Sequence, residues 1–200
     1  MHIEVVGADL RPSRQDLLSR AFALRHHVFV EDRGWTFLRR PDGLDIDTHD
    51  AGATTHFLAL DGDSVIGHVR LVPGGYLAVA RADPERIRDA AGDTKIAGLS
   101  RFCVAPEVRS PLKDAVITHL FTAALEHAIE QGTGALLFDT DPSIVFILRA
   151  LGFSIKNVGE PAPIAGRMMQ PIVLKLDASA LSGILLKVAI WTRGVKNVLP

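Results

Sequence analysis

Apolar and polar residues alternate in several short segments of the chain and follow a three-to-four-residue period in others. Alternation is typical of half-buried strands, and the longer period is typical of amphipathic helices. The pattern predicts strands over residues 2–6, 55–60, 64–72, 95–105, 134–139, 153–158 and 169–176. It predicts helices over residues 14–30, 83–91, 112–131 and 142–151.

Turn residues connect these segments. Asp61-Gly62-Asp63 separates two strands and predicts a hairpin, whereas residues 34–53, rich in Gly and Asp, predict a long loop. The order of elements predicts an α/β (α+β) sandwich, a central mixed and mostly antiparallel sheet flanked by helices. No repeat or Ser/Gly-rich linker divides the 200 residues. We therefore expect a single domain over residues 1–200, with residues 178–200 as a C-terminal helical extension.

Charge and composition exclude several classes of protein. The 22 Lys and Arg residues nearly balance the 23 Asp and Glu residues, which argues against a strongly basic nucleic-acid-binding protein. The single cysteine, Cys103, can form neither an intrachain disulfide nor a Cys-based zinc site, and no H-E-x-x-H motif is present, so no metal is expected. No secretory leader and no apolar run of membrane-spanning length is visible, which predicts a soluble cytoplasmic protein without stable membrane insertion.

Four carboxylates lie close together in the predicted loop, at Asp42, Asp45, Asp47 and Asp50. Such a cluster suits an organic amine, a sulfonium or a metal ion. A calcium loop starting at Asp45 is excluded, because its sixth position is Asp50 rather than Gly and its twelfth is His56 rather than Glu. The alternative is a solvated acidic loop with Asx-turns.

Aromatic residues and an arginine precede this loop. Arg25 and Phe29 are four residues apart and share one face of the predicted helix, and Trp35 follows. Aromatic faces attract a cation with an apolar body, so these residues suit the same ligand as the carboxylates. Ordinary core packing, with Arg25 in a surface salt bridge, is the alternative.

Two arginines lie within apolar strands, Arg70 in HVRLV and Arg101 in LSRFCV. A buried charge must be paired, and the acidic loop is the expected partner. The result is either a preorganised polar pocket, which we favour, or a structural ion-pair network.

Other catalytic arrangements find little support. Cys103 lacks a local motif that would pair it with His26, His27, His49 or His56 as a base, so a core role is expected. Residues 98–102 miss the G-x-S-x-G elbow because the last position is Phe102. No G-x-G-x-x-G after a strand and no Walker sequence is present.

The chain resembles the acyl-homoserine-lactone synthases, the LuxI-type autoinducer synthases. The matching segments, in the family's order and at about its spacing, are Arg25-His-His-Val-Phe29, Trp35, Gly43-Leu-Asp45-Ile-Asp47-Thr-His-Asp50, Arg70-Leu-Val-Pro73 and Leu99-Ser-Arg101-Phe-Cys-Val104. A weaker match covers Leu151-Gly152-Phe153 and Gly159-Glu-Pro161. Each motif alone is weak, but five in register are specific.

The resemblance implies a GNAT-like acyltransferase fold and a two-step reaction. An acyl group passes from acyl-carrier protein or coenzyme A to the amine of S-adenosylmethionine, and the carboxylate then closes into a lactone with loss of methylthioadenosine. No further cofactor is implied. Residues matching the family's S-adenosylmethionine site are Arg25, Phe29, Trp35, Asp47, Asp50 and Arg70, and those assigned to catalysis are Asp45, Asp47 and Arg101.

The acyl donor is expected near the turn from Val104 into the helix that follows Pro111, where free backbone N–H groups suit pantetheine or phosphate. Arg109 and Lys113 would meet acidic groups of a carrier protein or of coenzyme A, or else are solvated charges. The acyl tail would lie near Leu120, Phe121, Phe138 and Phe146, which are equally good core residues.

One departure concerns the general base. The family has Glu where this chain has Asp45, which keeps the charge, but it also has Glu where this chain has Gly98. The attacking amine must lose a proton, so with Gly98 that role passes to Asp45 or water. Gly98 also leaves room for a bulkier or branched acyl group. Two alternatives therefore stay open: a GNAT-like N-acyltransferase acting on another amine, and a non-catalytic binding protein.

Overall fold

A computed structural model of the chain describes residues 1–7, 12–74 and 81–176. They form two compact units, Met1–Val72 with Ser100–Ala124, and Pro73–Leu99 with the chain from Leu125 onward. Strand β4 (Lys95–Val104) and helix α3 (Leu112–Glu130) contribute to both units. The expected helix over 178–200 lies outside the described residues, and the single-domain organisation stays a prediction.

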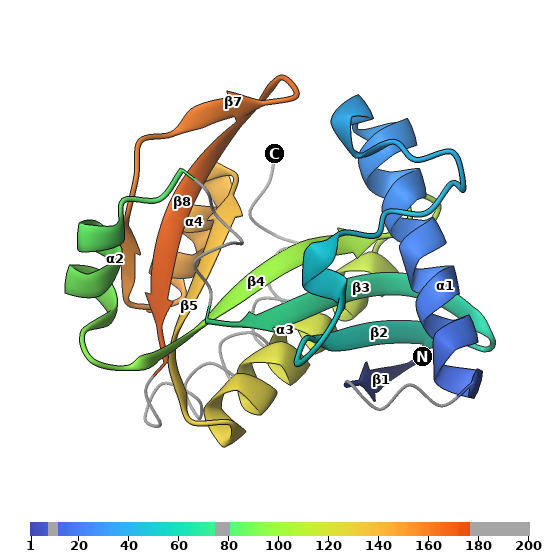
Figure 1. The fold of residues 1–200 in the computed structure, drawn as a ribbon, viewed down its shortest axis with the longest axis horizontal. Coiled ribbons are helices and arrows are strands. Elements are labelled where there is room, and N and C mark those ends of the chain that lie inside the picture. The colour runs from blue at the N-terminus through green and yellow to red at the C-terminus, as the bar shows by residue number, and fades with distance from the viewer. Residues whose placement is uncertain (8–11, 75–80, 177–200) are drawn as a thin grey trace. The chain divides into compact units, whose positions relative to one another are not determined.

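The strands form a mixed sheet, as expected (Figure 1). Its order is β1-β2-β3-β4-β5-β8-β6, with β7 paired to β8. β4 and β5 are parallel, whereas β1–β2, β2–β3, β5–β8 and β6–β8 are antiparallel. Besides β4, the strands are β1 (His2–Val6), β2 (Thr55–Asp61), β3 (Ser64–Pro73), β5 (Thr133–Thr140), β6 (Ile155–Asn157), β7 (Ala162–Ile164) and β8 (Arg167–Lys175).

The helices also match the sequence pattern closely. Besides α3, they are α1 (Pro12–His26), α2 (Pro84–Ala91) and α4 (Pro142–Ala150). The predicted first helix ends in a π-helical turn, His27–Asp32, and the long loop contains two 3-10 turns, Thr36–Leu38 and Thr48–Asp50. Phe29 lies in this π-helical turn, whose hydrogen-bond spacing differs from that of the α-helix that the periodicity predicted.

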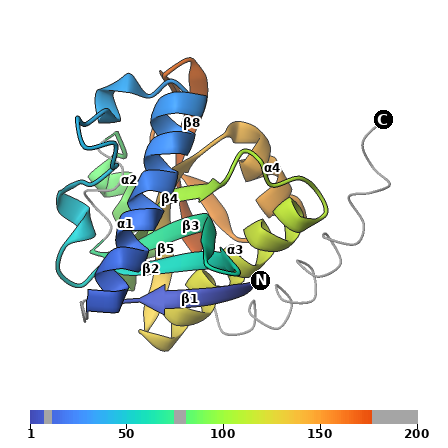
Figure 2. The same ribbon diagram turned by 90° about the vertical axis from the view of Figure 1, so that its right-hand side faces the viewer.

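In the first unit, helices cover both faces of the β2–β3 hairpin. On one face, Leu58 and Leu60 pack against Leu18 and Phe22 of α1, which crosses these strands in Figure 2. On the other face, a Cβ on Gly67 would lie only 2.6 Å from Val116 Cγ1 of α3, so that helix packs directly on the backbone of β3. Side chains alternate between the two faces along each strand, and Gly67 with its partner Ala59 lies on the α3 face. His56, His68 and Arg70 therefore lie on the α1 face.

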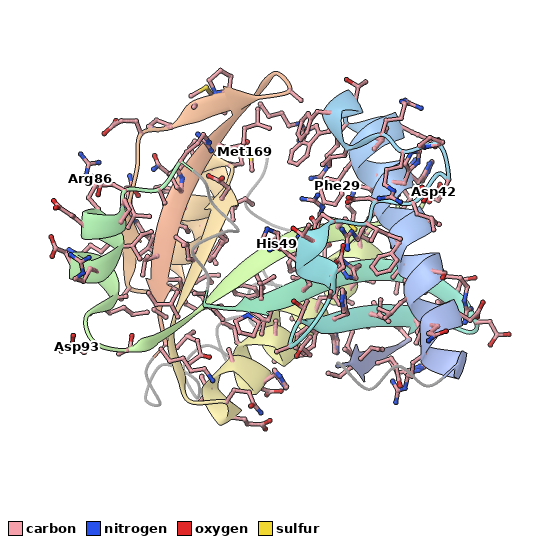
Figure 3. The ribbon with its side chains drawn as sticks, in the orientation of Figure 1. Phe29, Asp42, His49, Arg86, Asp93 and Met169 are labelled. Atoms are coloured by element: carbon pink, nitrogen blue, oxygen red, sulfur yellow. The ribbon has the colours of Figure 1, made fainter. Side chains whose placement is uncertain are left out.

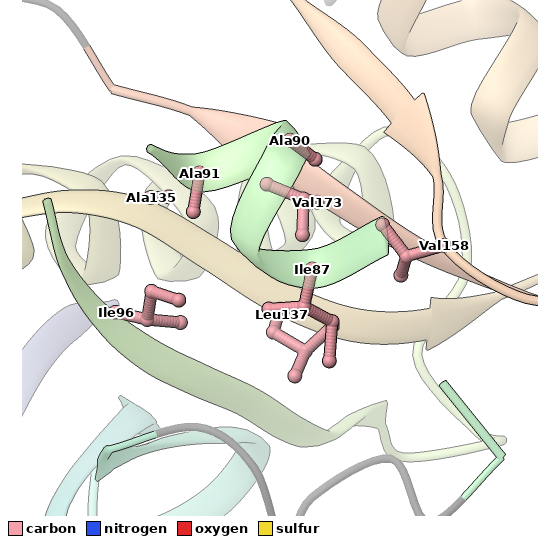
Figure 4. Packing of buried hydrophobic residues seen from close by; sticks show 8 residues of the cluster. All are labelled: Ile87, Ala90, Ala91, Ile96, Ala135, Leu137, Val158 and Val173. Atoms are coloured by element: carbon pink, nitrogen blue, oxygen red, sulfur yellow. The ribbon is translucent and has the colours of Figure 1, made fainter. Parts of the chain in front are cut away.

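The second unit has its own apolar core. Helix α2 contributes Ile87, Ala90 and Ala91, which pack against residues of β4, β5 and β8 (Figure 4). Asp83 caps this helix by accepting hydrogen bonds from the backbone N–H groups of Glu85 and Arg86.

Candidate active site

Three arginines and three aspartates form one ion-pair network inside the first unit. Arg25 comes from α1, Arg70 from β3 and Arg101 from β4, while Asp45, Asp47 and Asp50 come from the loop before β2. The sequence predicted that the acidic loop would pair with the strand arginines, and the structure confirms it. Arg25 is fully buried in this network, so it is not the surface salt bridge that was the alternative.

Arg70 holds two of the carboxylates. It donates Nη1 and Nη2 to the two oxygens of Asp47, each at 2.7 Å, and Nη1 also to Asp50 Oδ1 at 2.5 Å. Its Nε donates to Ser100 Oγ at 2.9 Å. Bidentate pairing of this kind fixes orientation as well as charge. Ser100 is a member of the network that sequence reasoning missed.

Asp45 and Asp50 are enclosed by guanidinium groups. Asp45 accepts from Arg25 Nε at 3.1 Å and from Arg101 Nε at 2.6 Å, and Asp50 accepts from Arg25 Nη1 at 2.6 Å. Both carboxylates are only 3% exposed. Asp45 therefore lacks the access expected of a base that takes a proton from a substrate.

Asp47 is the accessible carboxylate of the network, with 27% of its side chain exposed. Besides Arg70, it accepts from Arg101 Nη2 at 3.2 Å and from the His49 N–H at 2.8 Å. Burial alone would raise its pKa, but Arg70 and Arg101 outweigh that effect and hold the pKa well below its ordinary value. Asp47 is consequently ionised at neutral pH and lies where a cation can meet it.

Asp42, the fourth carboxylate of the loop, does not join the network. It pairs with the exposed Arg40 at 2.9 Å and accepts the Leu44 N–H in an Asx-type turn. Figure 3 shows Asp42 at the outer side of the first unit. The solvated-loop alternative is thus correct for this one residue.

Aromatic rings lie beside the network, as the sequence predicted. Phe29 and Trp35 have ring centroids 5.2 Å apart, and the guanidinium carbon of Arg101 lies 5.7 Å from the centroid of Phe29. The exposed Phe37 stacks on Trp35 at 5.8 Å, a contact that the sequence did not reveal. Trp35 Nε1 is buried and, within the described residues, has no hydrogen-bond partner. Phe29 is only 3% exposed and packs in an apolar cluster with Leu24 and Val28, so core packing describes this ring. Trp35 is half-buried and Phe37 is exposed, and these are the rings that an aromatic or cationic ligand can reach.

Cys103 is a core residue, as expected. It is buried with Leu24, Val28 and Phe29, and burial raises the pKa of its thiol to about 12. A thiol that does not ionise at neutral pH is a poor nucleophile. The strand is irregular two residues before Cys103, because Arg101 has a left-handed backbone with φ 55°.

The residues assigned to the acyl donor lie in different surroundings. Val104 and Leu120 are buried, whereas Arg109 is exposed and donates to the Pro106 carbonyl at 2.8 Å. Phe138 is buried, but Phe146 is 75% exposed, so the core alternative does not hold for Phe146. The roles of these residues, with Lys113 and Phe121, stay predictions.

Gly98 is buried and lies opposite Leu137 in the β4–β5 pair. Within the described residues, no group of His, Cys, Asp and Glu is arranged to hold a metal ion. In that same part of the chain, no helix has the length and hydropathy needed to cross a membrane.

Comparison with known proteins identifies the family. The profile described as "Autoinducer synthase" matches residues 10–183. This chain belongs to that family, the acyl-homoserine-lactone synthases, which are acyltransferases. The family, fold class and enzyme class that the sequence predicted are thereby confirmed.

Individual relatives and a solved structure are homoserine-lactone synthases as well. The isovaleryl-homoserine lactone synthase of Bradyrhizobium diazoefficiens is 31% identical over 80% of this chain and 73% of its own. An acyl-homoserine-lactone synthase of Acinetobacter nosocomialis is 31% identical over 78% of this chain and 90% of its own. The structure of BjaI, a CoA-dependent acyl-homoserine lactone synthase with S-adenosylmethionine and isopentyl-CoA, superposes with a TM-score of 0.77 at 26% identity, covering 94% of this chain and 89% of that one.

Proposed function

We propose that the chain transfers a short acyl group from coenzyme A to the amine of S-adenosylmethionine and that the product then closes to an acyl-homoserine lactone. The observation that carries this proposal is the geometry around Asp47. One ionised, partly exposed carboxylate is paired with Arg70 and Arg101, and Arg101 lies beside the ring of Phe29, which contacts Trp35. Such a site binds a substrate that combines a positive charge with an aromatic ring, as S-adenosylmethionine does.

In the first step, the amine nitrogen attacks the thioester carbonyl, an N–C bond forms and the C–S bond to coenzyme A breaks. The ammonium must first lose a proton. Asp45 is enclosed by Arg25 and Arg101, and Asp47 is a weak base because its pKa is lowered. We infer that water takes the proton while Asp47 orients the amine, and the thiolate of coenzyme A leaves.

In the second step, the carboxylate of the acylated substrate attacks its own γ-carbon. An O–C bond forms, the C–S⁺ bond breaks and methylthioadenosine leaves as a neutral thioether. Arg101 is the arginine of the network with the most exposed side chain, so it is the one placed to contact this carboxylate. Phe29 and Trp35 would hold the adenosyl group during both steps.

Coenzyme A is the proposed donor because BjaI is described as CoA-dependent and was solved with isopentyl-CoA. A branched acyl group fits the relative that makes isovaleryl-homoserine lactone. Arg109, in the segment before α3, and Lys113, in the first turn of α3, would meet the phosphates of the donor.

The donor can be tested with the purified protein. Isovaleryl-CoA, hexanoyl-CoA and the corresponding acyl-carrier proteins are compared by the rate of free thiol release. We expect isovaleryl-CoA to be used best. If a carrier protein is the better donor, Arg109→Glu should weaken its use more than the use of a small thioester, and equal effects would exclude docking at Arg109.

The proposed function itself is tested in a bacterium that makes no acyl-homoserine lactones and is fed isovalerate. The culture extract is searched by mass spectrometry for the fragment common to all such lactones. A lactone should form with the wild-type chain and fall at least about a hundredfold with Asp47→Asn. Asp42→Asn is the matched control, because Asp42 lies outside the network.

Gly98 favours one competing function, N-acylation of a different amine. In that case the purified protein would release thiol from acyl-CoA with another amine and form no methylthioadenosine. A chain that binds S-adenosylmethionine but turns over no thioester would instead be a binding protein.

A further inference from the structure

Two histidines lie buried behind the ion-pair network, on the α1 face of the hairpin. His56 on β2 and His68 on β3 are 1% and 0% exposed. The sequence offered His56 only as a base for Cys103. In the structure it contacts His68 instead, with Nδ1 of His56 lying 3.2 Å from Nε2 of His68.

The far side of the His68 ring contacts the backbone of the network. Nδ1 of His68 lies 3.1 Å from the carbonyl oxygen of Arg101. A carbonyl oxygen only accepts, so Nδ1 of His68 carries the proton and Nε2 is left as an acceptor. His56 must then donate from Nδ1, which gives a directed chain from His56 through His68 to Arg101.

Neutral rings fit these contacts. Burial, the largest effect on each ring, lowers the pKa of His56 to about 4 and the pKa of His68 well below its ordinary value. The positive charges of Arg25 and Arg70 act in the same direction on both rings, and only for His56 does Asp50 oppose them. Each ring therefore has one N–H at neutral pH. His68 donates its N–H to the Arg101 carbonyl, and for the N–H of His56 the backbone carbonyl of Asp50 is a second acceptor beside His68.

The hydrogen bonds from His56 through His68 end at the backbone of Arg101. Its φ of 55° is a conformation that side chains other than glycine adopt at a cost, so it persists only where neighbouring contacts hold it. The same residue places its guanidinium between two carboxylates, with Nε 2.6 Å from Asp45 Oδ2 and Nη2 3.2 Å from Asp47 Oδ2. A regular strand would direct the side chain differently.

We propose that His68, oriented by His56, is a positioning residue that holds the Arg101 backbone in its left-handed turn and thereby aims the Arg101 guanidinium at Asp45 and Asp47. The inference rests on the proposed function for its consequence in catalysis, because Arg101 and Asp47 are the members of the network that meet the substrate. The link between His68 and Arg101 itself needs no substrate.

Two substitutions at His68 separate this role from simple packing. In His68→Asn, the amide nitrogen takes the place of Nδ1 and can still donate to the Arg101 carbonyl. In His68→Gln, the amide reaches the place of Nε2 and the Arg101 carbonyl loses its donor. Both variants are polar, uncharged and smaller than His, and Asn is the smaller of the two, so a packing defect alone would harm His68→Asn more.

We expect His68→Asn to stay within about tenfold of wild-type kcat/KM and His68→Gln to lose about a hundredfold, mainly in kcat. In an Arg101→Ala background, His68→Gln should cause no additional loss, because the residue through which it acts is gone. Equal losses in the two variants, or full additivity with Arg101→Ala, would overturn the proposal.

If the variants fail to fold, a measurement on the wild-type protein still tests the proposal. Nitrogen NMR of labelled histidine should show His68 protonated at Nδ1 and unprotonated at Nε2 across neutral pH, and the opposite tautomer would overturn the inference. If the wild-type protein forms no lactone, the proposed function fails. The NMR result, with a crystal structure of His68→Gln showing whether Arg101 keeps its contact to Asp45, then still decides the inference.

Discussion

Arg70 shows most clearly how single residues build the site. One guanidinium contacts Asp47, Asp50 and Ser100 and is almost wholly buried. The planar guanidinium has several N–H donors in fixed directions and can reach all three acceptors at once. A lysine has only a single ammonium group on a flexible side chain.

Arg70→Lys should therefore leave part of the network unpaired. We expect the free energy of unfolding to fall by about 2–4 kcal/mol and lactone formation to fall at least about tenfold. Urea unfolding and a rate assay measure the two effects. Arg40→Lys is the control, since the exposed Arg40–Asp42 pair should change stability by less than about 0.5 kcal/mol. Equal effects of the two substitutions would contradict the assigned importance of Arg70.

The buried histidines make stability depend on pH. The pKa of His56 is about 4 in the folded chain, against about 6.5 when unfolded, so between these values the unfolded state binds more protons. Stability must therefore rise with pH through this window. From pH 7 to pH 5, His56 alone should remove about 2 kcal/mol from the free energy of unfolding.

Urea titrations at several pH values measure this slope. His56→Asn should flatten it. His27 acts with the opposite sign, because its hydrogen bond with Glu31 raises its pKa, so His27→Asn should make the slope steeper if it changes it at all. A wild-type stability that does not change between pH 7 and pH 5 would contradict the burial of the two neutral rings.

The sequence was sufficient to predict the charged residues of the site, because each of them needs an oppositely charged partner. It was not sufficient to predict the neutral residues that hold those charged residues in place. A charged residue in an apolar strand, such as Arg70, requires an oppositely charged partner, and the structure pairs Arg70 with Asp47 and Asp50. His68 gave no such signal, because a histidine in a strand is satisfied by many partners. Its contact with Arg101 depends on a backbone turn that no side-chain pattern encodes.

At the level of elements, the packing of α3 on β3 requires a glycine. A methyl group at Gly67 would meet Val116 Cγ1 at 2.6 Å and Leu120 Cδ1 at 2.9 Å, and both side chains are fully buried. Gly67→Ala should therefore destabilise the chain by about 1–3 kcal/mol. Gly7→Ala, where the added methyl meets nothing within 4 Å, is the control. Urea unfolding measures both, and a neutral Gly67→Ala would contradict the close contact.

Long periodic segments were predictable and short or irregular ones were not. The Asp-Gly turn and the flanking alternation correctly predicted the β2–β3 hairpin. The three-residue strand β7 was missed, because three residues are too few to show a period. The π-helical turn was missed because residues 27–30 keep a helical spacing of apolar positions.

At the scale of the whole molecule, the whole ion-pair network lies in one compact unit although its members are up to 76 positions apart, from Arg25 to Arg101. Each of the five motifs in register contributes a residue to that network or to the aromatic rings beside it, whereas residues 151–153 and 159–161 do not. This explains why five weak motifs in register indicated the family, while none alone did.

We propose that one protein carries out both acyl transfer and lactone closure on S-adenosylmethionine. Methylthioadenosine arises only if the second step follows the first, so it is the most direct product to measure. The purified chain is given S-adenosylmethionine and isovaleryl-CoA, and methylthioadenosine, free thiol and lactone are quantified together. We predict that all three form in equal amounts and that none forms when either substrate is omitted. Thiol release without methylthioadenosine, or activity only with a different amine, would contradict the account.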